Sequence, residues 1–163
     1  MGFQCYDENK RKRLIIINKI CSFFGHRDTS SEIRPALYVE IERHITQCNV
    51  TIFYVGEHGR FDRMSVSVLC DLKQKYPHIK ICLIHSHMPG KKERCEEKRY
   101  DCTLLPDGME FVPKKFAITH RNRFVVNESD YVIAHVRTTW GGAYDAMQYA
   151  KRKKKYVINL ADE

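Results

Sequence analysis

The chain has 163 residues, of which 43% are hydrophobic and 29% charged, and its formal net charge is +8. This length favours one domain, which can bury about two-thirds of its unfolded surface without a metal or a disulfide. No apolar run approaches the about 18 residues that cross a bilayer, and the N-terminus lacks a signal-peptide pattern. We therefore expect a cytoplasmic protein without membrane contact, and the basic charge favours anionic partners.

The first half of the chain alternates between predicted strands and helices. After a basic tail over residues 1–18, residues 19–24 form a short apolar run that ends at a glycine and predicts a buried strand. Serines cap a predicted helix over residues 30–47, and residues 50–55 predict the second strand. Apolar residues at helical spacing predict a helix over residues 61–76, which a proline ends.

The second half begins with a predicted strand over residues 79–85, after which the alternation of strands and helices is interrupted. Residues 87–115 are long, charged and rich in proline and glycine, and we interpret them as a flap loop over the site, with a short strand near residues 103–105. After the flap the alternation resumes with a helix, a strand, a helix and a strand over residues 117–128, 131–136, 142–153 and 156–160.

Strands that alternate with helices of this length predict βαβ units and a parallel sheet. We therefore expect one Rossmann-like α/β domain over residues 19–163, a three-layer sandwich with a mainly parallel sheet of about five strands. In such sheets the ligand lies outside the carboxyl ends of the strands, where the strand order reverses. The residues that follow each predicted strand are therefore the candidates for chemistry.

The seven cysteines are odd in number and contain no Cys-x-x-Cys pair. Most stand in apolar runs, which predicts buried free thiols in a reducing compartment. A zinc site built from His85, His87, Cys95 and Cys102 would not match the spacing of structural zinc sites. We expect neither a metal nor a cofactor, and no cysteine nucleophile, because no cysteine clearly follows a predicted strand.

Glycines and basic residues gather at the predicted strand ends and at the helices that follow them. Glycine lets the backbone approach an anion, a helix N-terminus offers unpaired N–H groups, and arginine adds charge-assisted contacts to phosphate. An aromatic side chain there can stack on a ligand. The candidate ligand-binding residues are Gly25, His26, Arg27, Gly56, Gly59, Arg60, Arg121, Asn122, Trp140, Gly141, Gly142 and Ala143. Gly56 also suits a plain turn, and Arg121 also suits a solvated helix face.

Six short motifs follow one another along the chain: Phe24-Gly25-His26-Arg27; Phe53-Tyr54-Val55-Gly56 with Gly59-x-Phe61-Asp62-Arg63; Tyr76-Pro77-His78-Ile79-Lys80; Phe116-Ala117-Ile118 with Arg121-Asn122-Arg123; Ser129-Asp130-Tyr131-Val132-Ile133-Ala134; and Trp140-Gly141-Gly142-Ala143. In this order they resemble the YpsA-like branch of the SLOG superfamily, which is named for the SMF/DprA and LOG proteins. The resemblance implies a Rossmann-like fold with a sheet order near 3-2-1-4-5. It also implies binding of nucleotides or nucleotide-derived ligands, such as the cyclic ADP-ribose variants sensed in bacterial and phage conflict systems. The branch itself is commonly described as of unknown function.

LOG enzymes cleave the N-glycosidic bond of nucleoside monophosphates with the motif Gly-Gly-x-Gly-Thr-x-x-Glu. From Gly141 this chain reads Gly-Gly-Ala-Tyr-Asp-Ala-Met-Gln, so that Tyr144, Asp145 and Gln148 replace the glycine, the threonine and the glutamate. Glutamine cannot act as a base or stabilise an oxocarbenium charge as a carboxylate does. The resemblance therefore favours binding without LOG-type catalysis.

Three functions remain open. The leading one is binding of a nucleotide or an ADP-ribose-like ligand, as a sensor or sequestering module. The second is hydrolysis of a nucleotide, with Glu57, Asp62 and Asp145 as the available carboxylates. The third, less favoured, is binding of single-stranded nucleic acid, for which the basic run at residues 151–155 is a candidate patch, although it also suits a helix end. The apolar edge strand at residues 156–160 would allow a homo-oligomer.

Overall fold

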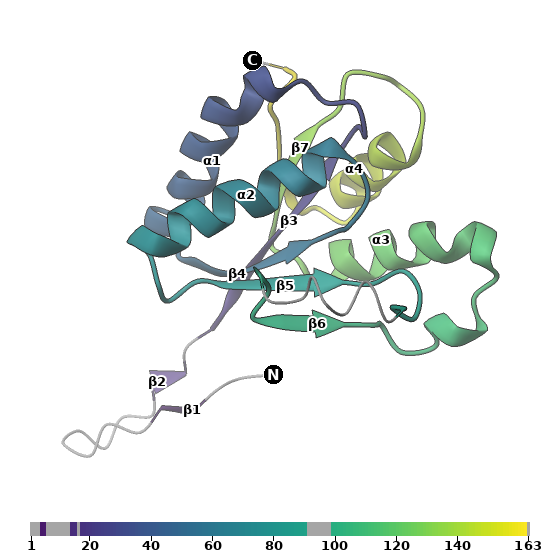
Figure 1. The fold of residues 1–163 in the computed structure, drawn as a ribbon, viewed down its shortest axis with the longest axis horizontal. Coiled ribbons are helices and arrows are strands. Elements are labelled where there is room, and N and C mark those ends of the chain that lie inside the picture. The colour runs from purple at the N-terminus through teal and green to yellow at the C-terminus, as the bar shows by residue number, and fades with distance from the viewer. Residues whose placement is uncertain (1–3, 6–13, 16, 91–98, 163) are drawn as a thin grey trace.

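A computed structural model describes the protein over residues 4–5, 14–15, 17–90 and 99–162. Its centre is a six-stranded parallel sheet in the order β6-β5-β4-β3-β7-β8 (Figure 1). The strands are β3 (Lys19–Gly25), β4 (Val50–Val55), β5 (Lys80–Ile84), β6 (Cys102–Leu104), β7 (Tyr131–His135) and β8 (Tyr156–Asn159). The predicted Rossmann-like α/β fold is confirmed, and so is the order of its five main strands. The short strand expected in the flap joins the sheet as its sixth member, at one edge.

Two helices cover each face of this sheet (Figure 1). On one face lie α1 (Arg34–Thr46), which follows a short 3₁₀ turn, η1 (Ser31–Ile33), and α2 (Arg60–Lys75). On the other face lie α3 (Ala117–Glu128) and α4 (Gly142–Arg152). The chain builds outward from β3 to β5 on one side and from β7 to β8 on the other, so the strand order reverses between β3 and β7. That reversal opens a crevice at the carboxyl ends of these two strands.

Local signals in the sequence account for the helix boundaries. The Ser30 hydroxyl accepts a hydrogen bond from the Glu32 N–H at 3.3 Å, as an N-cap residue does. Pro35 stands in the first turn of α1, where its missing N–H has no intrahelical partner to lose. The helix α2 ends at Lys75 because Pro77 follows shortly after and cannot continue it.

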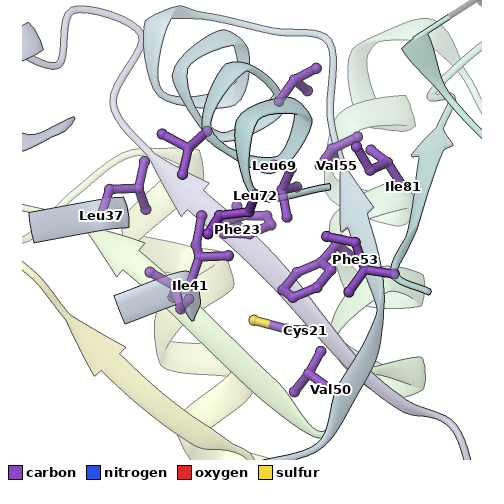
Figure 2. Packing of buried hydrophobic residues seen from close by; sticks show 14 of the residues in the cluster. Cys21, Phe23, Leu37, Ile41, Val50, Phe53, Val55, Leu69, Leu72 and Ile81 are labelled. Carbon is purple, nitrogen blue, oxygen red and sulfur yellow. The ribbon is translucent and has the colours of Figure 1, made fainter. Parts of the chain in front are cut away.

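Side chains of the strands alternate between the two faces and fill two separate cores. On β3, Phe23 packs on the α1 and α2 side and Phe24 on the α3 and α4 side. Figure 2 shows Phe23 beside Phe53 of β4, with ring centroids 6.1 Å apart, beneath Leu72 of α2. Each such side chain contributes about 1.5–3 kcal/mol when fully buried. The strands are therefore apolar on both faces, as expected of a parallel sheet covered on both sides.

One expectation about the cysteines, that they are free thiols, is wrong for two of them. Cys82 of β5 and Cys102 of β6 form a disulfide, whereas free thiols were expected. The two residues are 20 positions apart, but the register of β5 on β6 places them directly opposite each other. Cys21, Cys48 and Cys70 are free, and of these Cys21 is buried. Spacing along the chain could not reveal the pair, because the sheet register brings it together.

The predicted flap over residues 87–115 is partly described. Residues 91–98, which include Cys95, lie outside the described residues. The rest holds β6 and two short 3₁₀ helices, η3 (Met109–Phe111) and η4 (Lys114–Phe116). In this described part, the segment extends the sheet edge and then leads into α3.

The predicted N-terminal tail contains two short strands. β1 (Gln4–Cys5) and β2 (Leu14–Ile15) pair antiparallel with each other, apart from the main sheet. The basic run at residues 10–13 lies outside the described residues. Among the residues that the structure describes, no helix is both long and apolar enough to span a bilayer.

Candidate functional site

A cavity of about 510 Å³ occupies the crevice where the strand order reverses, and we call it the β3–β7 cavity. The end of β3 and its following loop form one wall, and the residues around the start of α2 form another. The first turns of α3 and α4 close the remaining sides. Its lining residues are Phe23, Phe24, Gly25, His26, Arg27, Asp28, His58, Asp62, Ile118, Arg121, Asn122, Trp140, Gly142 and Ala143. The fold thus brings together residues from four separate parts of the chain.

Gly25 is required at the end of β3 because the chain passes very close to α2. A Cβ on Gly25 would lie 2.3 Å from Cγ of Phe61, whose ring is fully buried. Phe61 in turn stacks on His135 at the end of β7, with ring centroids 6.3 Å apart. This packing fixes the position of Gly25, which lines the β3–β7 cavity.

The helices α2 and α4 both begin after a glycine with a left-handed backbone. Gly59 has φ of 97° and Gly141 has φ of 95°, and neither helix has a side-chain cap. At α2 the first N–H, that of Arg60, donates to the Arg27 carbonyl at 3.0 Å. At α4, the N–H groups of Gly142 and Ala143 have no acceptor within the described part of the chain. The α4 terminus therefore offers open N–H groups at this cavity.

Gly56 makes room for a buried pair of opposite charges. A Cβ on Gly56 would lie 2.5 Å from Nη1 of Arg121 and 2.7 Å from Oδ2 of Asp62. Gly56 does not line the β3–β7 cavity, so its missing side chain serves this pair rather than a direct approach to a ligand. Arg121 and Asp62 are 7% and 8% exposed, and both line the cavity.

Burial raises the pKa of Asp62 from its ordinary value of 3.8 to about 6. The positive charge of Arg121 and a hydrogen bond donated by the His58 N–H, 2.9 Å from Oδ2, act in the opposite direction. Burial also lowers the pKa of Arg121, against the attraction of Asp62 and Glu57. Shifts of this kind are typical of functional sites, because both charges are costly to keep away from water.

Two polar side chains at the cavity carry buried atoms without partners. The Nε of Arg121 and the Oδ1 of Asn122 have no hydrogen bond in the structure, although each residue is more than nine-tenths buried. Both lie on the first turns of α3 and line the β3–β7 cavity. A buried polar atom without a partner costs about 1–3 kcal/mol, and a ligand that supplies the partner recovers that cost. The alternative of a solvated helix face for Arg121 is therefore not what the structure shows.

A histidine-rich network lies next to the Asp62–Arg121 pair. Glu57 Oε2 lies 3.3 Å from His85 Nδ1, and His58 Nε2 lies 3.3 Å from the Ser86 hydroxyl. Ser86 also lies 3.2 Å from His87 Nδ1. Burial, followed by the nearby charge of Arg121, lowers the pKa of His58. Because its pKa is lowered, His58 favours the neutral form at physiological pH.

The loop after β7 is held by His26. The Arg137 N–H donates to His26 Nε2 at 3.1 Å, and the Thr138 hydroxyl donates to the Trp140 carbonyl at 2.8 Å. These contacts place Trp140 at the rim of the cavity, where it is 73% exposed. His26 therefore shapes the loop through one ring nitrogen, besides lining the cavity.

The structure separates the predicted residues into two groups. Gly25, His26, Arg27, Arg121, Asn122, Trp140, Gly142 and Ala143 line the β3–β7 cavity, as does the candidate carboxylate Asp62. Gly59 and Gly141 cap the adjoining helices, whereas Arg60, Glu57 and Asp145 do not line this cavity. The prediction omitted five lining residues, which are Phe23, Phe24, Asp28, His58 and Ile118. The strand-end position of His58 and Asp28 was a usable signal, whereas nothing local marked Ile118.

No group of three or more metal-binding side chains gathers anywhere in the described residues. Gln148 and Asp145, which stand where the LOG motif has its glutamate and threonine, line a second cavity between α3 and α4. They are therefore not part of the β3–β7 lining.

The fold and this crevice define a Rossmann-like α/β domain with a ligand-sized cavity at its switch point. Among solved structures, DNA processing protein A of Helicobacter pylori, described for its single-stranded DNA binding mode, is similar with a TM-score of 0.60 and 15% identity. The match covers 85% of this chain and 63% of that one. DNA processing protein A (DprA) of Streptococcus pneumoniae is similar with a TM-score of 0.53 and 13% identity, over 89% of this chain and 60% of that one.

At this identity the likeness shows a shared fold, which is consistent with the SLOG resemblance. The chain spans about three-fifths of the length of these DprA proteins. A scan against known protein families finds no match, and a search of curated proteins finds none.

Proposed function

We propose that the protein binds a nucleotide or nucleotide-derived ligand, with a phosphate group held in the β3–β7 cavity. The observation that carries this proposal is that two kinds of unsatisfied donor meet in one cavity. The N–H groups of Gly142 and Ala143 lie at the N-terminus of α4 and have no acceptor, and the buried Nε of Arg121 has no hydrogen-bond partner. A helix N-terminus beside a guanidinium is a suitable environment for phosphate.

The size and composition of the cavity support a small nucleotide. Its volume of about 510 Å³ falls within the range of small-molecule sites. Trp140 at the rim offers an exposed aromatic face on which a base can stack, and Arg27 adds an exposed positive charge. The assignment to the YpsA-like branch rests on the sequence motifs and is part of the same proposal, as is a role in sensing or sequestering the ligand.

Thermal unfolding against a panel of ligands tests this function. The panel holds AMP, ADP, ATP, NAD, ADP-ribose, cyclic ADP-ribose isomers, cyclic dinucleotides and a short single-stranded DNA. A ligand at 100 times its dissociation constant stabilises the folded state by about 2.7 kcal/mol, which raises the melting temperature by several degrees. We expect Arg27→Ala and Gly142→Val to weaken binding, because the first removes a charge and the second places a branched side chain at the open N–H groups.

Arg63→Ala is the matched control, because Arg63 is an exposed arginine that does not line the cavity. Equal ligand affinity in Arg27→Ala, Gly142→Val and Arg63→Ala would refute the assignment of the phosphate to this cavity. No stabilisation by any nucleotide would refute the function itself.

Single-stranded nucleic acid is the second candidate. It is favoured by the fold shared with the Helicobacter pylori protein, whose described activity is single-stranded DNA binding, and by the net charge of +8. Binding of this kind weakens steeply with salt, because phosphate contacts release counterions. Affinity for a short oligonucleotide that stays flat between low and moderate salt would count against it.

A further inference from the structure

A second cavity lies between α3 and α4, directly beside the first. It has a volume of about 410 Å³, and we call it the α3–α4 cavity. Ile118, Asn122 and Gly142 line both cavities, so the two share a border. We call the two adjoining cavities together the groove, which extends from the carboxyl ends of the strands along α3 and α4.

Asn122 lies at this border, and its side chain has an acceptor without a hydrogen-bond partner. It is 8% exposed, and its Oδ1 has no partner in the structure. The same side chain lines the cavity on either side. A ligand that passes from one cavity to the other would run past this atom and could donate a hydrogen bond to it.

The far end of the groove is positively charged around one tyrosine. The guanidinium carbons of Arg123 and Arg152 lie 5.8 and 5.7 Å from the centre of the Tyr149 ring, and Lys153 Nζ lies 5.5 Å from it. The Tyr149 hydroxyl donates to Asn127 Oδ1 at 3.0 Å, which fixes the ring. No carboxylate of the described residues forms an ion pair with these three cations, so their charge is available to an anion.

The remaining walls suit the other parts of a nucleotide. Tyr144 is half-buried and supplies aromatic surface for a base, while Asp145 and Gln148 supply oxygen acceptors for ribose hydroxyls or base N–H groups. The charge is unevenly arranged, because Asp145 is at the beginning of α4 whereas Arg152 is at its end. A phosphate is therefore favoured at the end of the groove that holds Arg123 and Arg152.

We propose that the α3–α4 cavity holds the second nucleotide unit of a ligand whose first phosphate lies in the β3–β7 cavity, so that the ligand class is two nucleotide units joined through phosphate. This inference rests on the proposed function of the β3–β7 cavity. The same chemistry is presented by a free dinucleotide and by the end of a single-stranded nucleic acid.

Calorimetric titration of the full chain tests the inference. The probes are the four 5′-mononucleotides, the four matching 5′-phosphorylated homodinucleotides and a single-stranded DNA of about 12 nucleotides. We expect at least one dinucleotide to bind about tenfold more tightly than its mononucleotide, the gain from about one charge-assisted contact. Arg123→Ala and Arg152→Ala are expected to remove that gain and leave mononucleotide affinity unchanged.

Lys151→Ala is the matched control, because Lys151 is an exposed cation of the same helix that lines neither cavity. Mononucleotide binding without any gain for dinucleotides would overturn this inference alone, as would equal losses in Arg152→Ala and Lys151→Ala. Failure of every mononucleotide and dinucleotide to bind would overturn the proposed function as well. If the inference holds, a DNA affinity well above that of the dinucleotide, with a steep salt dependence, identifies a nucleic-acid end as the source. Equal affinities for the DNA and for the dinucleotide identify a free dinucleotide as the source of the ligand.

Discussion

We expect Asp62→Asn to make the protein more stable at neutral pH. Asp62 is 8% exposed, and burial raises the pKa of its carboxyl from 3.8 to about 6. The folded state therefore keeps the proton over a pH range in which the unfolded chain has released it. Asparagine has a similar shape, carries no charge and keeps an oxygen that can accept the hydrogen bond from the His58 N–H.

The magnitude follows from the pKa difference. Between pH 3.8 and about 6 the folded state binds more protons than the unfolded state, so stability falls as the pH rises through this range. Above about pH 7 the full cost is present, and a rise from 3.8 to about 6 corresponds to about 3 kcal/mol. For a chain of this size that is a rise of about 6–12 °C in the melting temperature of Asp62→Asn.

Urea denaturation of wild type and variant at several pH values between 4 and 8 measures this effect. The advantage of Asp62→Asn should be largest at pH 8 and shrink as the pH falls towards 4, where Asp62 is protonated in the folded state and only partly ionised in the unfolded chain. Asp28→Asn is the control, because Asp28 is an exposed carboxylate of the same cavity, and its effect should stay within about 0.5 kcal/mol. A variant that is less stable than wild type at pH 8, or an advantage that does not change with pH, would show that burial does not raise the pKa of Asp62.

Two further predictions concern the framework. Gly25→Ala should destabilise the protein by about 1–3 kcal/mol in urea, because the new methyl group overlaps the Phe61 ring, whereas Gly142→Ala has no neighbour within 4 Å and should not. Equal stability of the two variants would contradict the close approach at Gly25. Cys102→Ser should lower the free energy of unfolding by about 3 kcal/mol under non-reducing conditions. The substitution removes the disulfide to Cys82, which closes a loop of 20 residues in the unfolded chain. That difference in stability should disappear in excess reductant. A difference that persists would show that Cys102→Ser does not act through loss of the disulfide.

The buried pair of Asp62 and Arg121 also bears on function. Both charges are held out of water at a cost, and the Nε of Arg121 has no partner to offset it. Groups kept in such an arrangement are typical of binding or catalytic sites rather than of a stable core. Of the three carboxylates proposed for the hydrolytic alternative, Asp62 lines this cavity, whereas Glu57 and Asp145 do not.

The sequence by itself determined the elements and the edge of the sheet at which the candidate site lies. The predicted bounds of β4 and α3 coincide with those in the structure, because strand and helix periodicity and the turn residues between them act locally. The parallel order also followed, since strands that alternate with helices must cross over. Those rules place the carboxyl ends of the strands, and hence Arg27 and Gly142, on one edge.

The tertiary structure alone decided which of these residues meet. Gly56 makes room for Arg121 and Asp62, Cys82 is bonded to Cys102, and Asn122 borders two cavities. Each of these contacts joins residues on different elements. Local pattern fixes the conformation of a segment, but the register of the strands and the packing of helices on the sheet are set by the whole core, so the partners of a side chain cannot be predicted from its neighbours in the sequence.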